Sequence, residues 1–473
     1  EHAQFALLTD WPDANTEHLA SDAPQLADML LQLQLLNAQH PALPVAYAIA
    51  DGEETPRFIL LHRARQFSQS EQAWIGWERK RGKLEQLIGL LARGPAGGTG
   101  VFMDLGAASR IAPHTPYVLT LDADTHLPPG RLRELVGVAA HPHNTPRVDP
   151  RLRRVVAGYG ILQPRVATPL PAVGQGTLYH SLFAGQSGID PYSAATSEVY
   201  QDVFSEGSFS GKGLLHVAAL HAVLGDRLPQ GQVLSHDLLE GSLARCAAAT
   251  DITLIEDAPF HADVAAARLH RWTRGDWQLL PLLLQPRQFA LRGVHRWKML
   301  DNLRRSLVAP LSLAALVLAL SGALGSPWSV LWLVLAAFVA GPLMGAVAGF
   351  APSRDDIAQR HFYAQAGADL LRALLSGVWH LALLLQQALS SADAIARALW
   401  RSFVSRRLLL QWTTAAAVQA QASTDLIGLW RQHRLTPMVA AALWLVLALA
   451  GSPHLALATG LCLLWALAPL WVW

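Results

Sequence analysis

The sequence predicts an α/β fold in which a mainly parallel sheet carries helices on both faces and is followed by transmembrane and interfacial helices. Two observations lead to this fold class. Short apolar segments alternate with amphipathic helical segments through residues 1–300, a pattern typical of a parallel sheet covered on both sides. After Ser306 the chain contains long stretches without charged residues, as membrane helices do. A chain of 473 residues has room for more than one domain.

The alternation can be followed segment by segment. Strands are predicted at Phe5–Asp10, Phe58–Arg63, Tyr117–Asp122, Val155–Val166, Gln232–Ser235 and Ile252–Ala258. Helices are predicted at 21–38, 77–93, 128–140, 214–225, 236–249 and 262–284. Between them, the glycine-rich stretch Gly185–Gly213 is too long for a simple connection, and loop-length statistics favour a functional role for it.

Acidic residues stand at the ends of two predicted strands. Asp10 ends the first strand, and Asp122 and Asp124 follow the strand that begins at Tyr117. Ligands of open sheets bind beyond the carboxyl ends of the strands. Two carboxylates in an extended turn can share one divalent cation, which prefers oxygen ligands and neutralises a departing diphosphate. Taken alone, the motif also fits an acidic pair that is merely solvated.

Asp237, in the stretch VLSHDLLEG, lies at the start of a predicted helix. Its carboxylate can act as a general base that removes a proton from an attacking hydroxyl. It can equally be an N-terminal carboxylate that only stabilises the helix dipole. Glu240 lies one turn later and is a candidate structural partner.

Two basic segments are candidates for phosphate binding. In RLHRWTRGDWQ, Arg271 and Arg274 can hold phosphates while Trp272 offers a flat face to a sugar. In RKRGK, Lys83 belongs to a cluster that can contact a nucleotide diphosphate. The first segment can instead be an interfacial helix anchored by Trp and Arg, and the second a solvated basic face.

Two pairs of apolar segments predict membrane hairpins. Leu307–Leu324 and Trp328–Phe350 are each long enough to cross a hydrocarbon core of about 30 Å. Pro437–Ala450, which is short for a span, and Leu455–Trp473 form the second pair. Lys and Arg lie before the first pair and between the pairs but not in the hairpin turns, so the folded domain, the middle segment and the chain end are predicted to be cytoplasmic.

The stretch Ala373–Leu389 is apolar enough to be a fifth crossing, but that would place Arg397, Arg401, Arg406 and Arg407 outside. We therefore expect a helix that lies in the membrane interface. The predicted domains are 1–300 (cytoplasmic α/β domain, first strand missing), 301–352 (transmembrane hairpin), 353–435 (interfacial amphipathic helices) and 436–473 (second, truncated hairpin).

The cysteine content, the net charge and the two ends of the chain further restrict what kind of protein this is. Cys246 and Cys462 lie far apart in apolar surroundings, so neither a four-thiolate metal site nor a disulfide framework is expected, and this favours a reducing, cytoplasmic side. The formal charge is near neutral at +2, and no nucleic-acid partner is expected. Because the chain begins with Glu and ends within an apolar run, we expect it to be a piece of a longer protein.

Taken in order, the motifs resemble a processive family-2-type glycosyltransferase with a GT-A fold. Within that family, the stretches WERKRGKLEQL, LDADT, EGSFSGKG, LSHDLLEG, RWTRGDWQ and SRRLLLQWTTAA resemble the glycosyltransferase region of cyclic β-1,2-glucan synthases. The resemblance covers nearly the whole chain. It implies a multi-pass protein of the bacterial inner membrane that extends a β-1,2-glucan acceptor from UDP-glucose with Mg²⁺ or Mn²⁺. Processing and cyclising modules of full-length synthases are absent from this stretch.

The resemblance also implies roles for single residues. Asp122 and Asp124 would bind the metal and the UDP-sugar diphosphate. Asp10 and Lys83 would contact the nucleotide, and Asp237 would be the base of an inverting transfer. Arg271, Trp272 and Arg274 would flank acceptor and diphosphate, and Gly207–Gly213, with Lys212, would shape the acceptor side.

Two departures from the cellulose synthase pattern leave room for alternatives. Arg268 replaces the Gln of the Q-x-x-R-W motif, and His236 replaces the acid that usually precedes the base. A related synthase that makes another linkage, such as a β-1,6-branched periplasmic or a cellulose-like glucan, is the nearest alternative. A transporter or regulatory membrane protein is disfavoured because the first two spans lack ionisable residues. A sugar-nucleotide-binding domain without catalysis is disfavoured by the presence of Asp237.

Overall fold

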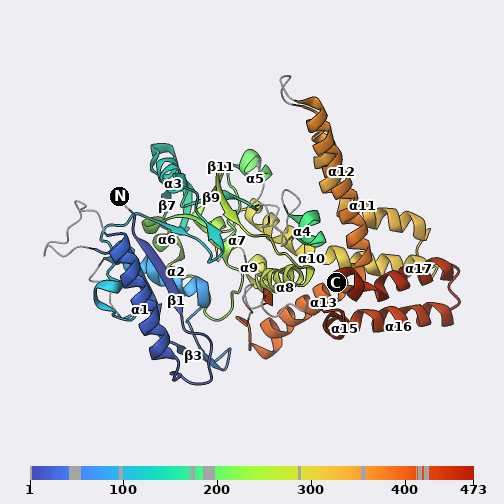
Figure 1. The fold of residues 1–473 in the computed structure, drawn as a ribbon, viewed down its shortest axis with the longest axis horizontal. Coiled ribbons are helices and arrows are strands. Elements are labelled where there is room, and N and C mark those ends of the chain that lie inside the picture. The colour runs from blue at the N-terminus through green and yellow to red at the C-terminus, as the bar shows by residue number, and fades with distance from the viewer. Residues whose placement is uncertain are drawn as a thin grey trace.

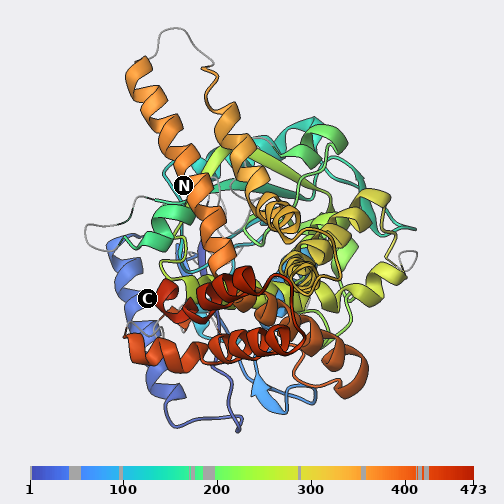
Figure 2. The ribbon, with the colours of Figure 1, turned by 90° about the vertical axis from the view of Figure 1, so that its right-hand side faces the viewer.

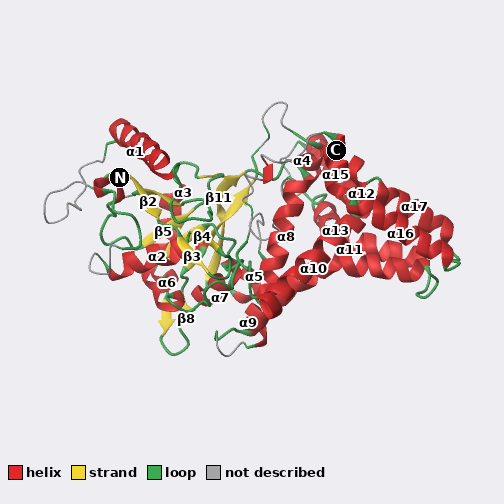
Figure 3. Ribbon diagram, turned by 90° about the horizontal axis from the view of Figure 1, so that it is seen from below, coloured by secondary structure: helices red, strands yellow, loops and turns green. Residues whose placement is uncertain are grey.

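The computed structural model describes residues 3–41, 55–94, 100–169, 171, 176–184, 198–285, 289–352, 358–411, 413, 418–419 and 425–473. Strands gather in one half of the molecule and long helices in the other (Figures 1 and 3). The chain passes from the first half to the second through the helix α8 (Ala262–Gln278). The first part of the predicted functional loop, residues 185–197, lies outside the described residues.

A five-stranded sheet forms the centre of the α/β half. Its order is β5 (Tyr117–Thr120), β10 (Gly213–His216), β9 (Ile161–Ala167), β11 (Cys246–Glu256) and β6 (Thr125–His126). β5, β9 and β11 run in the same direction, but β9 and β11 form the one parallel neighbouring pair among the described strands of this sheet, because β10 runs antiparallel to both of its neighbours and β6 antiparallel to β11. The α/β class is confirmed, but the prediction of a mainly parallel sheet is wrong for these strands. Two successive strands are parallel neighbours only if a crossover returns the chain to the end of the sheet at which the first strand began. β10 instead enters the sheet at the end where β9 leaves it, and so runs antiparallel to β9.

Smaller sheets complete the strand content. β1 (Phe5–Asp10) and β2 (Phe58–Arg63) form a parallel pair in which Asp10 stands opposite Arg63, and α1 (Asp22–Gln39) lies between them in sequence. Two antiparallel hairpins are β3/β4 and β7/β8. Their bounds are Gln66–Ser68 and Ala73–Ile75, then Arg147–Asp149 and Arg154–Ala157.

Helices cover both faces of the five-stranded sheet, as predicted. Leu162 and Leu214 pack with Leu135 of α3 (Arg131–Ala140) on one face. The neighbouring residues Ile161 and Leu215 pack on the opposite face, because successive side chains of a strand alternate between faces. That second core includes residues of α2 (Arg79–Arg93), α6 (Val217–Leu224) and α7 (Asp237–Ala244). Short helices α4 (Leu178–Phe183) and α5 (Val199–Phe204) and the 3₁₀ turns Gly106–Ser109 and Pro142–Asn144 lie in the connections.

Three local predictions are wrong at their boundaries. Gln232–Ser235 is not a strand, and the Leu234 amide donates to the Gln278 side chain at 3.1 Å rather than to a neighbouring strand. The helix predicted to 249 ends at Ala244, where Arg245 takes φ +54° and the chain turns directly into β11. The helix predicted from 214 begins only at Val217, because the residues before it form β10.

Within the described part of the helical half, two helices are long and apolar enough to cross a membrane, α10 (Gly293–Leu320) and α11 (Pro327–Ala348). Two bent pairs reach the same length and composition, α12 (Gln359–Ala382) with the stretch Leu384–Ser405, and α15 (Leu426–His433) with α16 (Leu435–Leu449). The stretch Leu384–Ser405 consists of α13 (Leu384–Trp400) and a π-helical turn at Arg401–Ser405. The remaining helices are α9 (Leu280–Leu284), α17 (Leu455–Ala466) and α18 (Ala468–Val472).

The helical half has its own apolar core. Leu316 and Leu320 of α10 pack with Leu384 of α13 and Trp465 of α17. Figure 2 looks onto this half and shows α16 and α17 side by side. The predicted interfacial stretch Ala373–Leu389 includes the bend between α12 and α13, where the axis turns by 66°. Which of these helices cross the bilayer remains a prediction.

Candidate active site

Three carboxylates meet at one edge of the five-stranded sheet. Asp122 follows β5, Asp124 precedes β6, and Glu256 ends β11. The antiparallel pairing of β6 with β11 sets Glu256 opposite Thr125 and so beside the Asp-x-Asp turn. Oxygen atoms of the three side chains lie within 4.8 Å of one another. Sequence reasoning singled out the two aspartates but missed Glu256.

Two lysines contact this acidic cluster. Lys80, at the start of α2, forms an ion pair with Asp122, and Lys212 lies with its Nζ 3.4 Å from Asp122 and 2.7 Å from Glu256. Burial raises the pKa of Asp122, but the two lysine charges outweigh it and the net pKa is lowered. Burial raises the pKa of Asp124, and the neighbouring Glu256 charge raises it further.

The acidic cluster fits a hard divalent cation. Three carboxylates offer the oxygen ligands that Mg²⁺ and Mn²⁺ prefer. Asp124 is exposed, so its oxygens are open to a ligand, while Glu256 is only 5% exposed. The Thr125 hydroxyl and the Arg268 guanidinium each donate to Glu256 at 3.2 Å, which orients that carboxylate.

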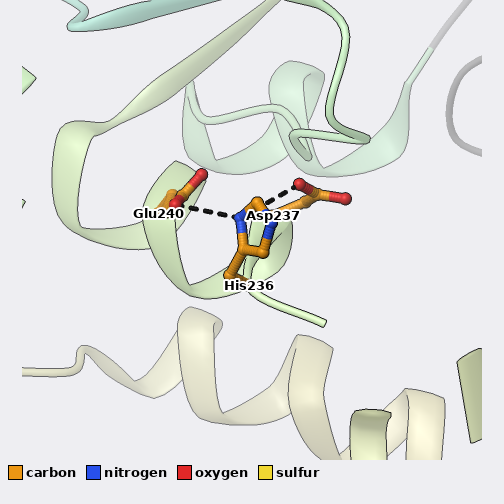
Figure 4. Close-up of side chains that lie close together, drawn as sticks. All are labelled: His236, Asp237 and Glu240. Atoms are coloured by element: carbon orange, nitrogen blue, oxygen red, sulfur yellow. Dashed lines mark ion pairs between the residues drawn. The ribbon is translucent and has the colours of Figure 1, made fainter. Parts of the chain in front are cut away.

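Asp237 belongs to a second group of side chains at the start of α7 (Figure 4). His236 Nδ1 lies 2.9 Å from Glu240 and 3.4 Å from Asp237. Burial lowers the pKa of His236, but the charges of Glu240 and Asp237 outweigh it and the net pKa is raised. The His236 ring thus lies close to both carboxylates, and the partner of Glu240 within this group is His236.

Gly211 connects the two groups. Its carbonyl accepts a hydrogen bond from Lys80 at 3.1 Å. Its φ is +89°, and a Cβ at this position would lie 2.9 Å from an Asp237 carboxylate oxygen. Only glycine meets both the left-handed backbone and this close approach.

Arg271 of α8 interacts electrostatically with both the acidic cluster and the Asp237 group. Burial lowers its pKa, with Arg268 adding to this, while the charges of Asp122 and Asp237 act in the opposite direction. Arg271 is therefore coupled electrostatically to both the Asp-x-Asp turn and the candidate base. The acid pair and Asp237 are not scattered over the molecule but occupy one region of it.

Asp10 and Lys83 lie together, with Lys83 Nζ 3.5 Å from the Asp10 carboxylate. Asp10 also accepts two hydrogen bonds from Arg63, at 2.6 and 3.0 Å. Sequence reasoning missed Arg63, although the parallel register of β1 and β2 sets it opposite Asp10. Because α2 carries both Lys80 and Lys83, one helix joins this pair to the acidic cluster.

Arg271, Trp272 and Arg274, which were predicted to flank acceptor and diphosphate, do not all lie at the acidic cluster. Arg271 is coupled electrostatically to Asp122 and Asp237, and the Arg268 guanidinium lies over the Trp272 ring, 4.9 Å from its centre. Arg274 is buried and donates to the backbone carbonyl of Gln411. Burial lowers the pKa of Arg274 to about 10. Its described partner is thus the stretch Leu408–Gln411. In the same stretch, the Leu410 amide donates a hydrogen bond to the Glu71 carboxylate at 2.8 Å.

A search of protein families finds no matching family model. Among curated proteins, the chain is 40% identical over 474 aligned residues to the cyclic beta-(1,2)-glucan synthase NdvB of Rhizobium meliloti (strain 1021). The chain is homologous to one region of that synthase. The alignment covers 99% of this chain and 16% of the synthase. The family resemblance predicted from the sequence motifs is confirmed, and it extends over the α/β half and the helical half alike.

Proposed function

We propose that this chain is a glycosyltransferase that moves glucose from UDP-glucose onto a growing β-1,2-glucan, the elongation step of cyclic glucan synthesis. The observation that carries the proposal is the meeting of the acidic cluster with Asp237 through Gly211 and Arg271. It occurs in a chain that is homologous to a region of a glucan synthase. Its α/β half is accordingly proposed to be a GT-A domain.

Asp237 is proposed as the general base. It takes the proton of an acceptor hydroxyl as that oxygen attacks the anomeric carbon from the face opposite the leaving group. A new β-glycosidic bond forms, the bond from the anomeric carbon to the diphosphate breaks, and UDP leaves with the electron pair. The absence of a side chain at Gly211 allows the Asp237 carboxylate to lie directly against the loop that carries Lys212.

Asp122, Asp124 and Glu256 would hold Mg²⁺ or Mn²⁺. When bound, such a cation neutralises charge on the departing diphosphate. Lys80 and Lys212 already lie against these carboxylates and would supply further positive charge to the phosphates. Arg271 faces the same region, and Asp10 with Lys83 would contact the nucleotide. Trp272 would offer its ring to a sugar.

The helical half is proposed to hold the enzyme in the bacterial inner membrane with the α/β domain in the cytoplasm. α10 and α11 have the length and composition of a transmembrane hairpin. The predicted boundaries at 301, 353 and 436 are retained in this proposal, with the middle segment in the interface. Glucan acceptor and bilayer are thus the expected partners.

The test uses membranes that contain the protein, supplied with UDP-glucose and Mn²⁺. Release of UDP is expected, and Asp237→Asn should lower it at least about 100-fold while UDP binding stays close to that of the wild type. Asp251→Asn, which removes an exposed carboxylate of β11, is the matched control. Wild-type turnover in Asp237→Asn would remove the base assignment.

Linkage analysis of the product decides between the related synthases. A β-1,2-linked product is expected. A β-1,6- or β-1,4-linked product would show that the chain belongs to a synthase of another glucan, and UDP binding without turnover would favour a domain without catalysis.

A further inference from the structure

The start of the first candidate membrane helix, α10, contacts one loop of the α/β half with three basic residues. Arg292, His295 and Lys298 recur at every third position and therefore share one face of the helix. Arg292 and His295 bind the Glu206 carboxylate, the latter with Nε2 2.8 Å from Oε2. Lys298 donates to the backbone carbonyls of Glu206 at 3.1 Å and Gly207 at 2.8 Å.

Three of the four side chains in this contact are buried, and Arg292 is exposed. Glu206 and Lys298 are each 3% exposed, and His295 is 2% exposed. Burial raises the pKa of Glu206, but His295 and the arginines outweigh it, so the net pKa is lowered. A buried charge is costly unless it is paired, so the buried Glu206 and Lys298 depend on the groups that they contact. The proposed mechanism uses none of them.

The loop that begins at Glu206 runs directly into the active site. The Gly207 amide donates to Cys246 of β11 at 2.9 Å. Three residues later, the Ser210 amide and hydroxyl both donate to Gln163 of β9, at 2.9 and 3.0 Å. The next two residues are Gly211, beside Asp237, and Lys212, between Asp122 and Glu256. The loop is therefore held at Glu206 and Gly207 by α10, along its length by β9 and β11, and at Lys212 by the carboxylates of the site.

We propose that Glu206 is a positioning residue through which α10 holds Gly211 and Lys212 in place among the carboxylates of the site. This proposal rests on the proposed function, because that function is what makes the carboxylates a metal and diphosphate site. It adds a physical link between the membrane-crossing part of the chain and the metal and diphosphate region. Arg292, His295 and Lys298 form the other half of this link.

The experiment compares purified full-length chain in detergent with Glu206→Gln, which keeps the side-chain shape and removes the charge. The Mn²⁺ concentration for half-maximal UDP release is expected to rise roughly 10-fold, as found when residues behind metal ligands are changed, and KM for UDP-glucose should rise with it. Lys298→Met, which removes the contacts to both carbonyls, should give the same shift. Asp301→Asn is the control, because Asp301 lies on the same helix and forms its ion pair with Arg304 of that helix, at 2.8 Å.

A folding defect alone would lower the amount of active protein without changing the Mn²⁺ requirement or KM. Wild-type values for both in Glu206→Gln and Lys298→Met would overturn the proposal. If Glu206→Gln does not fold, Lys298→Met decides in the same way. Titration of Mn²⁺ binding by electron paramagnetic resonance gives a readout that does not need turnover. An inactive wild type that binds Mn²⁺ about 10-fold more tightly than Glu206→Gln would count against the proposed function but support the link.

Discussion

At the scale of single residues, the carboxylates of the site differ in environment more than in type. Asp122 lies between two lysines that lower its pKa, whereas burial and its acidic neighbours raise the pKa of Asp124. The Asp-x-Asp spacing identified both from sequence. Glu256 was not identified, because it lies more than a hundred residues away and joins them only through the pairing of β6 with β11. Its one local signal was an acid at the end of a predicted strand.

Glu256→Gln tests whether this third carboxylate belongs to the cation site. The variant keeps the hydrogen-bonding shape but removes a charge that faces Lys212 and Arg268. The affinity for Mn²⁺ should fall about 10- to 100-fold, measured as the Mn²⁺ concentration for half-maximal UDP release. Asp257→Asn changes the adjacent, exposed carboxylate and should leave that concentration unaltered. Equal values in both variants would exclude Glu256 from the site.

At the scale of elements, α8 serves several partners with different faces. Arg268 donates a hydrogen bond to Glu256, and Arg271 is coupled electrostatically to Asp122 and Asp237. Arg274 and Gln278 donate to backbone carbonyls of the stretch Leu408–Gln411. Trp277 donates to Ser306 of α10 at 2.9 Å. One amphipathic helix thus contacts both the site and the helical half.

Element types were predictable from local pattern, while orientations and several boundaries were not. Apolar runs identified β1, β2, β5 and the second half of β11, although of these β2 is the strand buried along most of its length and Phe5 and Leu7 of β1 are exposed. The direction of β10 depends on how the preceding loop enters the sheet, which local sequence does not encode. Val233 is buried like a strand residue, yet its neighbour Leu234 binds α8. The contact with α8, and not the local apolar pattern, determines the conformation of residues 232–235.

Asp276 of α8 gives a pH-dependent prediction. Burial raises its pKa from 3.8 to about 6, although Asn302 of α10 donates to it at 3.1 Å. Between these two pH values the folded state binds more protons than the unfolded state, so the free energy of unfolding falls as pH rises. Above pH 6 the cost is fully present, and two pKa units correspond to about 3 kcal/mol.

Asp276→Asn should therefore raise the unfolding temperature in detergent at pH 8 and have little effect at pH 4.5. The amide keeps a hydrogen bond to Asn302 without a buried charge. Intrinsic fluorescence during heating, compared with Asp251→Asn across this pH range, measures the difference. A gain of equal size at both pH values would show that the carboxylate charge is not its cause.

At the scale of the whole molecule, the chain joins an α/β half that carries the site to a helical half with a separate apolar core. The division was visible in the sequence because charged residues become sparse after Ser306. The number of membrane crossings was not visible in the sequence, because bends such as that between α12 and α13 interrupt apolar stretches. Apolar composition reports burial in lipid and burial in protein alike. The buried Leu384 and Leu385 at this bend belong to the protein core.

Membrane topology follows from charge placement and can be measured directly. Basic residues crowd the start of α10, whereas the turn between α10 and α11 contains neither Lys nor Arg. The positive-inside bias then places Ser326 in that turn outside the cytoplasm and Ala351, after α11, inside it. Both residues are exposed. The two native cysteines are buried, so background labelling should be low, and burial raises the pKa of Cys246 to about 12.

Ser326→Cys should therefore react with a membrane-impermeant maleimide in spheroplasts, while Ala351→Cys should react only after the membrane is opened. The two sites lie at opposite ends of α11, a helix of 22 residues or about 33 Å, so opposite labelling requires that helix to cross the bilayer. Labelling of both sites in intact spheroplasts, or of neither, would mean that α11 lies on one side. In that case the hairpin would pack along the membrane, and Glu206 would be tied to a surface helix.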